Sequence, residues 1–149
     1  ATFDAPTMRP SAPLIGETTL LGQQVIDLAQ GAANGVRGHV GLTVDAPIKA
    51  VQEFADRFQK RFNYVCDHNG IKGYTAVYMI KHVTEKVGKF DSKAFAAAAH
   101  GITISPRQEP NILMEATWDK NGDIDRDSFL GEVVNGQQKI VEILPKLGK

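Results

Sequence analysis

The chain has 149 residues, of which 42 % are apolar and 23 % charged, which suits one globular domain better than two domains or a disordered chain. Its 17 Lys plus Arg residues balance 17 Asp plus Glu residues, which argues against nucleic-acid binding, since such binding needs a basic excess. No apolar run approaches the roughly 20 residues of a membrane-spanning helix, and the single cysteine, Cys66, excludes an internal disulfide and a multi-cysteine zinc site.

The start of the chain shows no export signal. Residues 1–6 lack the basic start and the apolar stretch of a signal peptide, so either the protein is not exported or its targeting segment lies outside this chain. Prolines at positions 6, 10 and 13 predict an extended or loop segment.

Short elements are predicted next. Leu14–Gly16 indicates a short buried strand that stops at the glycine. Residues 20–29 have apolar side chains at helical spacing, and a threonine of the preceding Glu17-Thr18-Thr19 is a candidate cap for that helix. Four glycines then prevent a regular helix, and His39–Val44 predicts a strand.

The middle of the chain is helical. Asp45-Ala46-Pro47 combines a cap residue with a proline, a pattern typical of a helix start. A helix over 47–62 is predicted by an apolar stripe at 3.6-residue spacing, made of Ile48, Val51, Phe54, Ala55, Phe58 and Phe62.

Two further helices are predicted. Residues 67–70 read as a polar loop before a helix near 71–87, and Asp91 is the expected cap of a helix over 92–99. A glycine follows each helix and ends it.

The last part of the chain is expected to be β-structure. Strands are predicted at 112–118, 128–134 and 139–144. Residues 119–123 indicate a turn, and Asn135-Gly136 predicts a type I′ hairpin. The fold class is therefore α/β, with three helices followed by a terminal antiparallel β-meander.

Residues 119–125 resemble a calcium loop at first sight. An EF-hand needs glycine at position six and glutamate at position twelve, where this chain has Ile124 and Leu130. The predicted flanks are also strands, so a β-turn rich in turn-forming residues is the better interpretation.

No catalytic or metal-binding arrangement stands out. The four histidines include no pair one helical turn apart with a third ligand in sight, so no metal site is expected. Cys66 and His68 are two residues apart, but a nucleophilic Cys–His pair is normally assembled by the fold, and a half-buried structural cysteine is the preferred interpretation.

Two polar clusters remain as candidate sites. Glu17-Thr18-Thr19 follows a predicted strand, and His68-Asn69-Gly70 precedes a predicted helix. Ligands of α/β proteins bind at the carboxyl ends of strands and at helix N-termini, but helix capping explains the same residues. The residues alone leave both interpretations open.

The segments that carry a family resemblance are Pro13-Leu14-Ile15-Gly16-Glu17-Thr18-Thr19, Ala32-Ala33-Asn34-Gly35-Val36, Phe54 with Phe58, Gly73-Tyr74-Thr75-Ala76-Val77, and Ala116-Thr117-Trp118-Asp119-Lys120-Asn121-Gly122-Asp123. The most specific segment is the Trp-Asp-x-x-Gly-Asp turn, and the order and spacing of all segments strengthen the resemblance. Together they resemble the carboxy-terminal part of a type I periplasmic solute-binding protein, with the branched-chain amino-acid (leucine/isoleucine/valine) binding-protein family as the nearest.

The resemblance implies two α/β lobes joined by three crossing strands, with ligand bound between the lobes and closure by a hinge. It places residues 13–36 and 111–149 in the carboxy-terminal lobe and 47–104 among helices of the amino-terminal lobe. The implied ligand-binding residues are Glu17, Thr18 and Thr19 from the first cluster and His68, Asn69 and Tyr74 from the second.

The function implied by the resemblance is the substrate-binding component of an ABC transporter, or a fragment of it. The ligand would be an amino acid or a related small carboxylate, aromatic or aliphatic. The partners would be the transporter's membrane subunits and the location the periplasm. No cofactor, metal or enzymatic activity is expected. The alternatives are a ligand-sensing regulatory domain of the same fold, an inactive truncated fragment, or an enzyme that uses Cys66 or a carboxylate.

The resemblance also predicts a partner chain. The helices at 47–62 and 71–87 carry apolar stripes that would cover a parallel sheet belonging to the family's amino-terminal half, which this chain lacks. Because monomers avoid large exposed apolar patches, we expect self-association or pairing with a chain that supplies the missing lobe.

Overall fold

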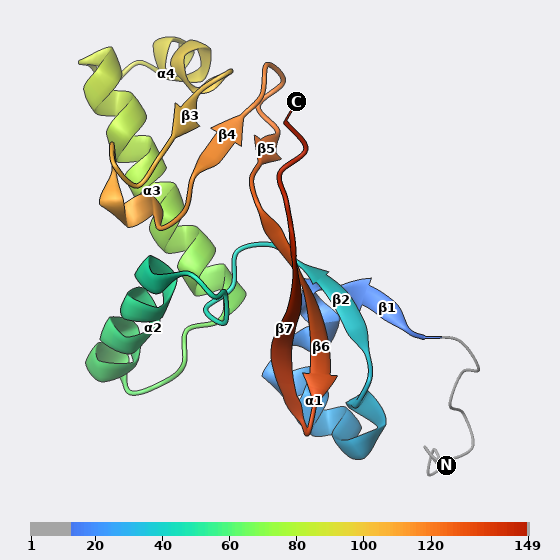
Figure 1. Cartoon of the computed structure of the whole chain (residues 1–149). Coiled ribbons are helices and arrows are strands. Elements are labelled where there is room, and N and C mark those ends of the chain that lie inside the picture. Colours follow the sequence, from blue (N-terminus) through green and yellow to red (C-terminus); the bar gives the residue numbers. More distant parts are fainter. Residues whose placement is uncertain (1–12, 149) are drawn as a thin grey trace. The chain divides into compact units, whose positions relative to one another are not determined.

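The structure is a computed structural model that describes residues 13–148. The chain divides into two compact units (Figure 1). The first takes the described residues up to Gly41 together with Ser128–Leu144, and the second takes Leu42–Asp127 and the residues from Pro145 onward. The predicted extended stretch around the first two prolines lies outside the described residues.

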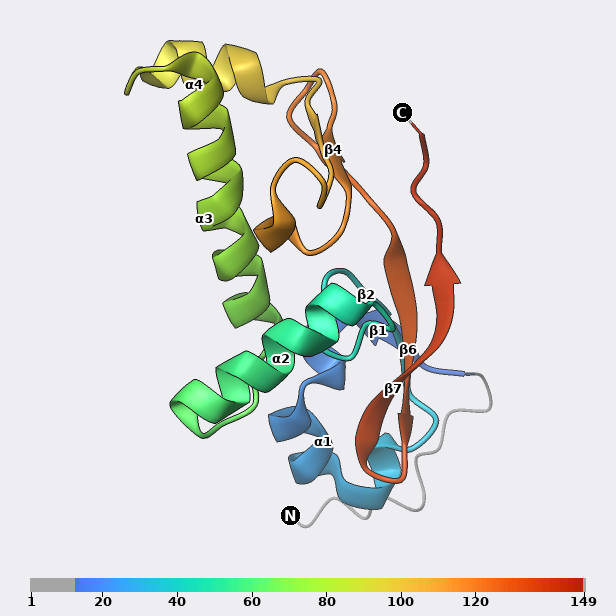
Figure 2. The ribbon, with the colours of Figure 1, turned by 60° about the vertical axis from the view of Figure 1, so that its left-hand side comes forward.

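The first unit is built on a four-stranded sheet. Its strand order is β1 (Ile15–Glu17), β2 (Arg37–Val40), β6 (Ser128–Val134) and β7 (Gln137–Leu144). β1 runs parallel to β2, whereas β2, β6 and β7 pair antiparallel. Figures 1 and 2 show α1 (Gln23–Ala29) alongside this sheet.

The prediction of a buried strand at Leu14–Gly16 is wrong in two respects. The strand extends to Glu17, and Ile15 is 68 % exposed. The reason is position: β1 pairs only with β2 among the described strands, so it lies at the edge of the sheet.

The predicted helix over 20–29 is broken into two pieces. A 3₁₀ turn, η2 (Thr18–Leu21), ends at Gly22, whose backbone is extended, and α1 begins after it. The predicted threonine cap is also wrong, because the Glu17 side chain accepts a hydrogen bond from the Thr19 backbone N–H at 3.0 Å. A second 3₁₀ turn, η3 (Gln30–Ala33), leads to β2.

The core of the first unit depends on two paired glycines. Gly38 of β2 faces Gly131 of β6 in the sheet register. A Cβ added at either position would lie within 2.9 Å of the Leu21 Cδ1 atom. The absence of both side chains therefore lets η2 pack directly on the sheet, where Leu21 is 2 % exposed.

The β6–β7 hairpin confirms the predicted turn. Asn135 and Gly136 have φ values of 52° and 74°, and a type I′ turn needs positive φ at both positions. β7 begins at Gln137, two residues before the predicted strand. Asn34 fixes the turn from outside, because its Oδ1 accepts from the Gly136 N–H at 3.0 Å.

The second unit contains three α-helices and a small antiparallel sheet. α4 lies at the carboxyl end of α3 (Figure 2). The elements are α2 (Lys49–Phe62), α3 (His68–Val87), α4 (Ser92–Ala99), β3 (Thr103–Ile104), η4 (Pro110–Ile112), β4 (Ala116–Trp118) and β5 (Ile124–Asp125). Its apolar core contains Val83, Ala99, Ile102, Ile104 and Ile112.

The three predicted helices are confirmed; the helix over 92–99 begins as predicted after Asp91, and the starts of the other two are corrected. α2 begins at Lys49 after an extended Ile48, so Asp45 is not its cap residue. α3 begins at His68 because the Asp67 side chain accepts from the Gly70 N–H at 2.7 Å. The predicted polar loop at 67–70 is therefore the cap and first turn of α3.

Two predicted strands are shorter in the structure. The strand expected at His39–Val44 ends at Val40, because the chain leaves the first unit after Gly41. The strand expected at 112–118 begins only at Ala116. Leu113 interrupts it with a φ of 67°, which lies outside the β region of backbone conformation.

None of the described helices has both the length and the apolar character that crossing a membrane requires.

Candidate functional site

Glu17, Thr18 and Thr19 lie at the carboxyl edge of the parallel pair in the first unit. Glu17 is the last residue of β1 and is in register with His39 of β2. The Thr18 hydroxyl donates to the His39 carbonyl oxygen at 3.2 Å. The structure therefore brings the predicted cluster together with His39, a residue that the sequence pattern did not connect to it.

The chemistry of this edge follows from its exposure. Glu17, Thr19 and His39 are exposed, and Thr18 is half-buried. The Glu17 carboxylate already receives the Thr19 N–H, which holds it in place at the end of the strand. An exposed, oriented carboxylate can pair with a ligand's ammonium group, and the threonine hydroxyls can hydrogen-bond its polar atoms.

The second predicted cluster lies on α3 and is spread around the helix. His68 and Asn69 belong to its first turn, where His68 is half-buried and Asn69 exposed. Consecutive residues are about 100° apart around the helix axis, and Tyr74, five residues after Asn69, is about 140° from it. The three side chains therefore do not share one face of the helix.

Tyr74 is part of the internal packing of the second unit. Its ring centroid lies 4.5 Å from that of Phe54 on α2 and 4.9 Å from that of Tyr78. Its hydroxyl donates to Asn111 Oδ1 at 2.5 Å. Burial, together with the neighbouring Tyr78, raises the pKa of Tyr74. A ligand that accepts a hydrogen bond from the Tyr74 hydroxyl would therefore compete with Asn111.

A buried carboxylate continues this network. Glu109 is 4 % exposed, and its two oxygens accept from Asn111 Nδ2 at 3.1 Å and from Lys81 Nζ at 2.9 Å. The hydrogen bond from Lys81 lowers the pKa of Glu109 below its usual range. The network joins η4 to α3 and thereby places Tyr74. No sequence pattern indicated it, because its members are far apart in the chain.

Cys66 has the environment of a structural thiol. It is buried, and burial with the adjacent Asp67 charge raises its pKa to about 11. Gly70 makes room for it, since a Cβ there would lie 2.6 Å from the sulfur. A thiol that stays protonated near neutral pH is a poor nucleophile, which agrees with the structural interpretation.

The turn at 119–123 is confirmed. Asp119 Oδ1 accepts from the Asn121 and Asp123 N–H groups at 2.7 and 3.0 Å, and Gly122 has a φ of 88°. These hydrogen bonds lower the pKa of Asp119. Within residues 13–148 no group of three or more His, Cys, Asp or Glu side chains could hold a metal ion.

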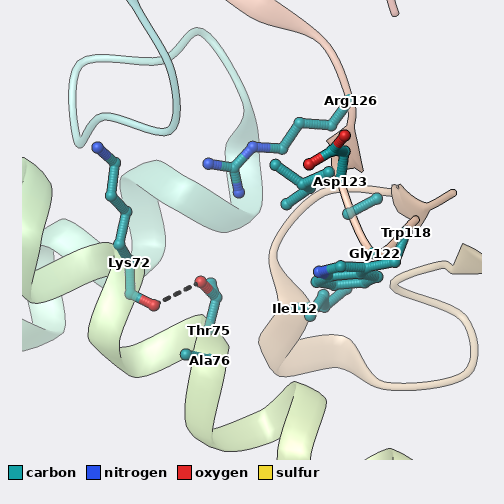
Figure 3. A pocket seen from close by; sticks show the side chains of 10 residues that line it. Lys72, Thr75, Ala76, Ile112, Trp118, Gly122, Asp123 and Arg126 are labelled. Atoms are coloured by element: carbon teal, nitrogen blue, oxygen red, sulfur yellow. Dashed lines mark hydrogen bonds between the residues drawn. The ribbon is translucent and has the colours of Figure 1, made fainter. Parts of the chain in front are cut away.

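The second unit also has a cavity of about 450 Å³, which sequence reasoning did not find (Figure 3). α3 contributes Lys72 and Thr75 to its lining, and the region of β4 and β5 contributes Trp118, Asp123 and Arg126. Trp118 drew attention only through its motif. Arg126 is the only cation in an acidic run, Asp123–Asp127, and this is the one signal that could have singled it out.

The two predicted clusters belong to different units. Glu17, Thr18 and Thr19 are in the first, and His68, Asn69 and Tyr74 are in the second.

Comparison with known proteins gives a family match over most of the chain. A family model described as periplasmic binding protein matches residues 9–138. No curated protein gave a significant match.

Solved structures share the fold at low sequence identity. A leucine-binding protein from Thermotoga maritima superposes with a TM-score of 0.76 at 14 % identity, over 94 % of this chain and 39 % of that one. A solute-binding protein of an ABC transporter from R. palustris, in complex with benzoate, gives 0.71 at 18 % identity, over 92 % and 37 %.

A third example is a solute-binding protein of an ABC transporter from Rhodopseudomonas palustris HaA2, in complex with p-hydroxybenzoic acid. It gives a TM-score of 0.72 at 18 % identity, over 90 % of this chain and 37 % of that one. The chain thus spans 37 to 39 % of the length of these structures.

Proposed function

The chain belongs to the periplasmic binding protein family, and from this premise we propose that it is part of the substrate-binding component of an ABC transporter. The resemblance to leucine-binding-like type I proteins and the α/β fold class are confirmed. The family consists of binding proteins rather than enzymes, so the proposed activity involves no covalent step. The proposed partners are the transporter's membrane subunits and the proposed location is the periplasm.

The proposed ligand is an amino acid or a related small carboxylate, bound between the two lobes of the complete protein. The observation that carries this is the position of Glu17 and Thr18 at the carboxyl end of β1, beside His39 of the parallel strand β2. Solved relatives, described as a leucine-binding protein and as a complex with benzoate, agree with a ligand of this size and class.

We assign the candidate residues different roles. Glu17, Thr18 and Thr19 would contact ligand directly, with Glu17 pairing an ammonium group. His68 and Asn69, on the first turn of α3, would face it from the amino-terminal lobe. Tyr74 would contact the ligand with its aromatic ring. Its hydroxyl, which donates a hydrogen bond to Asn111, would hold η4 against α3.

The lobe assignment is also a proposal. Residues 13–36 would belong to the carboxy-terminal lobe and 47–104 to the amino-terminal lobe. The unit boundary after Asp127 groups residues 111–127 with the helices of the second unit, although the resemblance placed 111–149 together in the carboxy-terminal lobe. We therefore propose that the carboxy-terminal lobe resumes at Ser128.

The test is a ligand titration of the complete protein by calorimetry, with leucine and benzoate as probes. For an amino-acid ligand, Glu17→Gln is expected to weaken binding about tenfold or more, because it removes a charge-assisted contact. Glu142→Gln, which changes an exposed carboxylate on β7, is the matched control and should bind normally. Equal affinity of the Glu17 variant and the wild type would contradict the proposed role of Glu17.

A further inference from the structure

The cavity of the second unit combines two cations with an aromatic ring. In Figure 3 the guanidinium of Arg126 extends from the β5 side toward the α3 wall, which carries Lys72, and Trp118 lines the same cavity. We propose that this cavity binds a small carboxylate with a flat apolar body, held by Arg126 and Lys72 against Trp118. The cavity belongs to the second unit, whereas the edge that carries Glu17 belongs to the first.

Arg126 has no counter-ion among the residues that the structure describes. Among residues 13–148 it forms no ion pair and no hydrogen bond, although aspartates flank it on both sides. Burial lowers the pKa of Arg126 below its ordinary value. A guanidinium stays charged even so, and a partly desolvated charge without a partner is costly. An anionic ligand would relieve this cost.

The flanking aspartates are engaged by the end of the chain. The two oxygens of Asp125 accept from the Leu147 and Gly148 N–H groups, each at 2.8 Å. Asp127 Oδ1 accepts from the Lys146 N–H at 3.0 Å. These carboxylates therefore hold residues 146–148, and the cavity keeps the positive charge of Arg126.

The lining has an excess of positive charge. Lys72 adds a second ammonium group, which forms no ion pair in the described part of the chain, and Asp123 is the only acidic residue of the lining. No ion pair joins Asp123 to Arg126. Two cations against one carboxylate favour an anion and disfavour a ligand that carries its own ammonium group.

The other residues that line the cavity favour a ligand whose uncharged part is apolar and flat. Ala76, Ile112, Ala116 and Ile124 are apolar, and Trp118 offers a flat aromatic face. A volume of about 450 Å³ is within the range of small-molecule sites. An aromatic ring can stack on Trp118 while its carboxylate forms paired hydrogen bonds with the guanidinium.

The test uses Trp118 as its reporter, because it is the only tryptophan of the chain. Benzoate is titrated into the 149-residue chain with excitation at the red edge of tryptophan absorption. We expect a saturable change of fluorescence. Benzamide, the neutral isostere, should bind about tenfold or more weakly, because it cannot pair with the cations. Leucine should produce no change.

Three variants decide the outcome. Arg126→Gln should weaken benzoate binding about tenfold or more. Lys72→Gln should also weaken benzoate binding. Arg107→Gln, which changes an exposed arginine of the same unit, should bind normally. Circular dichroism checks that each variant is folded, and if Arg126→Gln fails to fold, Lys72→Gln decides.

The proposal is overturned by an absence of saturable change with the wild type, by equal binding of benzoate and benzamide, or by unchanged binding to folded Arg126→Gln and Lys72→Gln. Glu17→Gln should leave the Trp118 signal intact. If Glu17 does not bind ligand, the benzoate titration of the cavity still gives its own answer. Each of the two proposals can therefore be refuted without the other.

Discussion

Cys66 and Glu17 show how the surroundings of a side chain decide whether it can be ionised and reached by a ligand. Cys66 is buried beside Gly70, next to a carboxylate, and its pKa is raised. Glu17 is exposed and oriented by a backbone N–H at the end of a strand. The first arrangement suppresses ionisation and access, whereas the second presents a charge to solvent, where a ligand can meet it.

The thiol gives a test at this scale. With a pKa of about 11 against an ordinary value of 9.0, Cys66 holds about 100-fold less thiolate at pH 8. Alkylation by iodoacetamide should therefore be at least that much slower in the folded chain than in the chain unfolded by guanidinium chloride. Equal rates in the two states would show that the thiol is neither buried nor perturbed.

The sequence predicted helices and turns correctly where neighbouring residues in the chain determine them. Asp91 accepts from the Ala94 N–H at 2.8 Å and begins α4, and Asn135-Gly136 closes the β6–β7 hairpin. Prediction failed where distant residues decide. The exposure of Ile15, for example, depends on which strands lie beside β1.

The same distinction applies to the candidate site, where local features could be predicted and long-range contacts could not. The positions of Glu17 and Thr18 could be predicted, because a strand end followed by polar residues is visible in the sequence. The link to His39 and the use of the Tyr74 hydroxyl by Asn111 could not, because each joins segments more than 20 residues apart.

The contact between η2 and the sheet predicts a steric effect. Gly131→Ala would place a Cβ 2.8 Å from Leu21 Cδ1 and should lower the free energy of unfolding by about 1–3 kcal/mol in urea denaturation. Gly31→Ala is the control, because its Cβ would meet nothing within 4 Å. A variant of Gly131 as stable as this control would argue against the close packing.

The link between η4 and α3 predicts a dependence on pH. Lys81 lowers the pKa of Glu109 in the folded state below its usual value of 4.5. The ion pair therefore stabilises the fold fully at pH values above 4.5, and this stabilisation is lost as the pH falls toward the lower pKa of the folded state. Glu109→Gln should therefore show a smaller loss of stability between pH 7 and pH 4 than the wild type.

Glu85 supplies the control for that experiment. Its carboxylate also meets Lys81 Nζ, at 3.0 Å, but its side chain is 64 % exposed, against 6 % for Glu109. Glu85→Gln should keep the wild-type dependence on pH, because exposed pairs contribute little. The same profile for the Glu85 and Glu109 variants would contradict the role of the buried pair.

At the scale of the whole molecule, the second unit has apolar side chains that the described chain leaves uncovered. Phe62 is 50 % exposed, Val77 62 % and Ile80 53 %. The chain spans 37 to 39 % of the length of the solved relatives, and we propose that the remaining sequence covers this surface in the complete protein. In the 149-residue chain a second copy would take that place.

This proposal predicts the oligomeric state. Light scattering with size-exclusion chromatography should find the 149-residue chain larger than a monomer at micromolar concentration. Ile80→Lys should shift it toward the monomer, whereas Val141→Lys, at a position 48 % exposed in the first unit, should not. A wild-type monomer under these conditions would refute self-association.

A crystal structure of the complete protein with its bound ligand would be the decisive measurement. We predict a polar atom of the ligand within hydrogen-bond distance of the Glu17 carboxylate or the Thr18 hydroxyl, at the carboxyl end of β1. A ligand bound by the complete protein with no contact to either residue would contradict it.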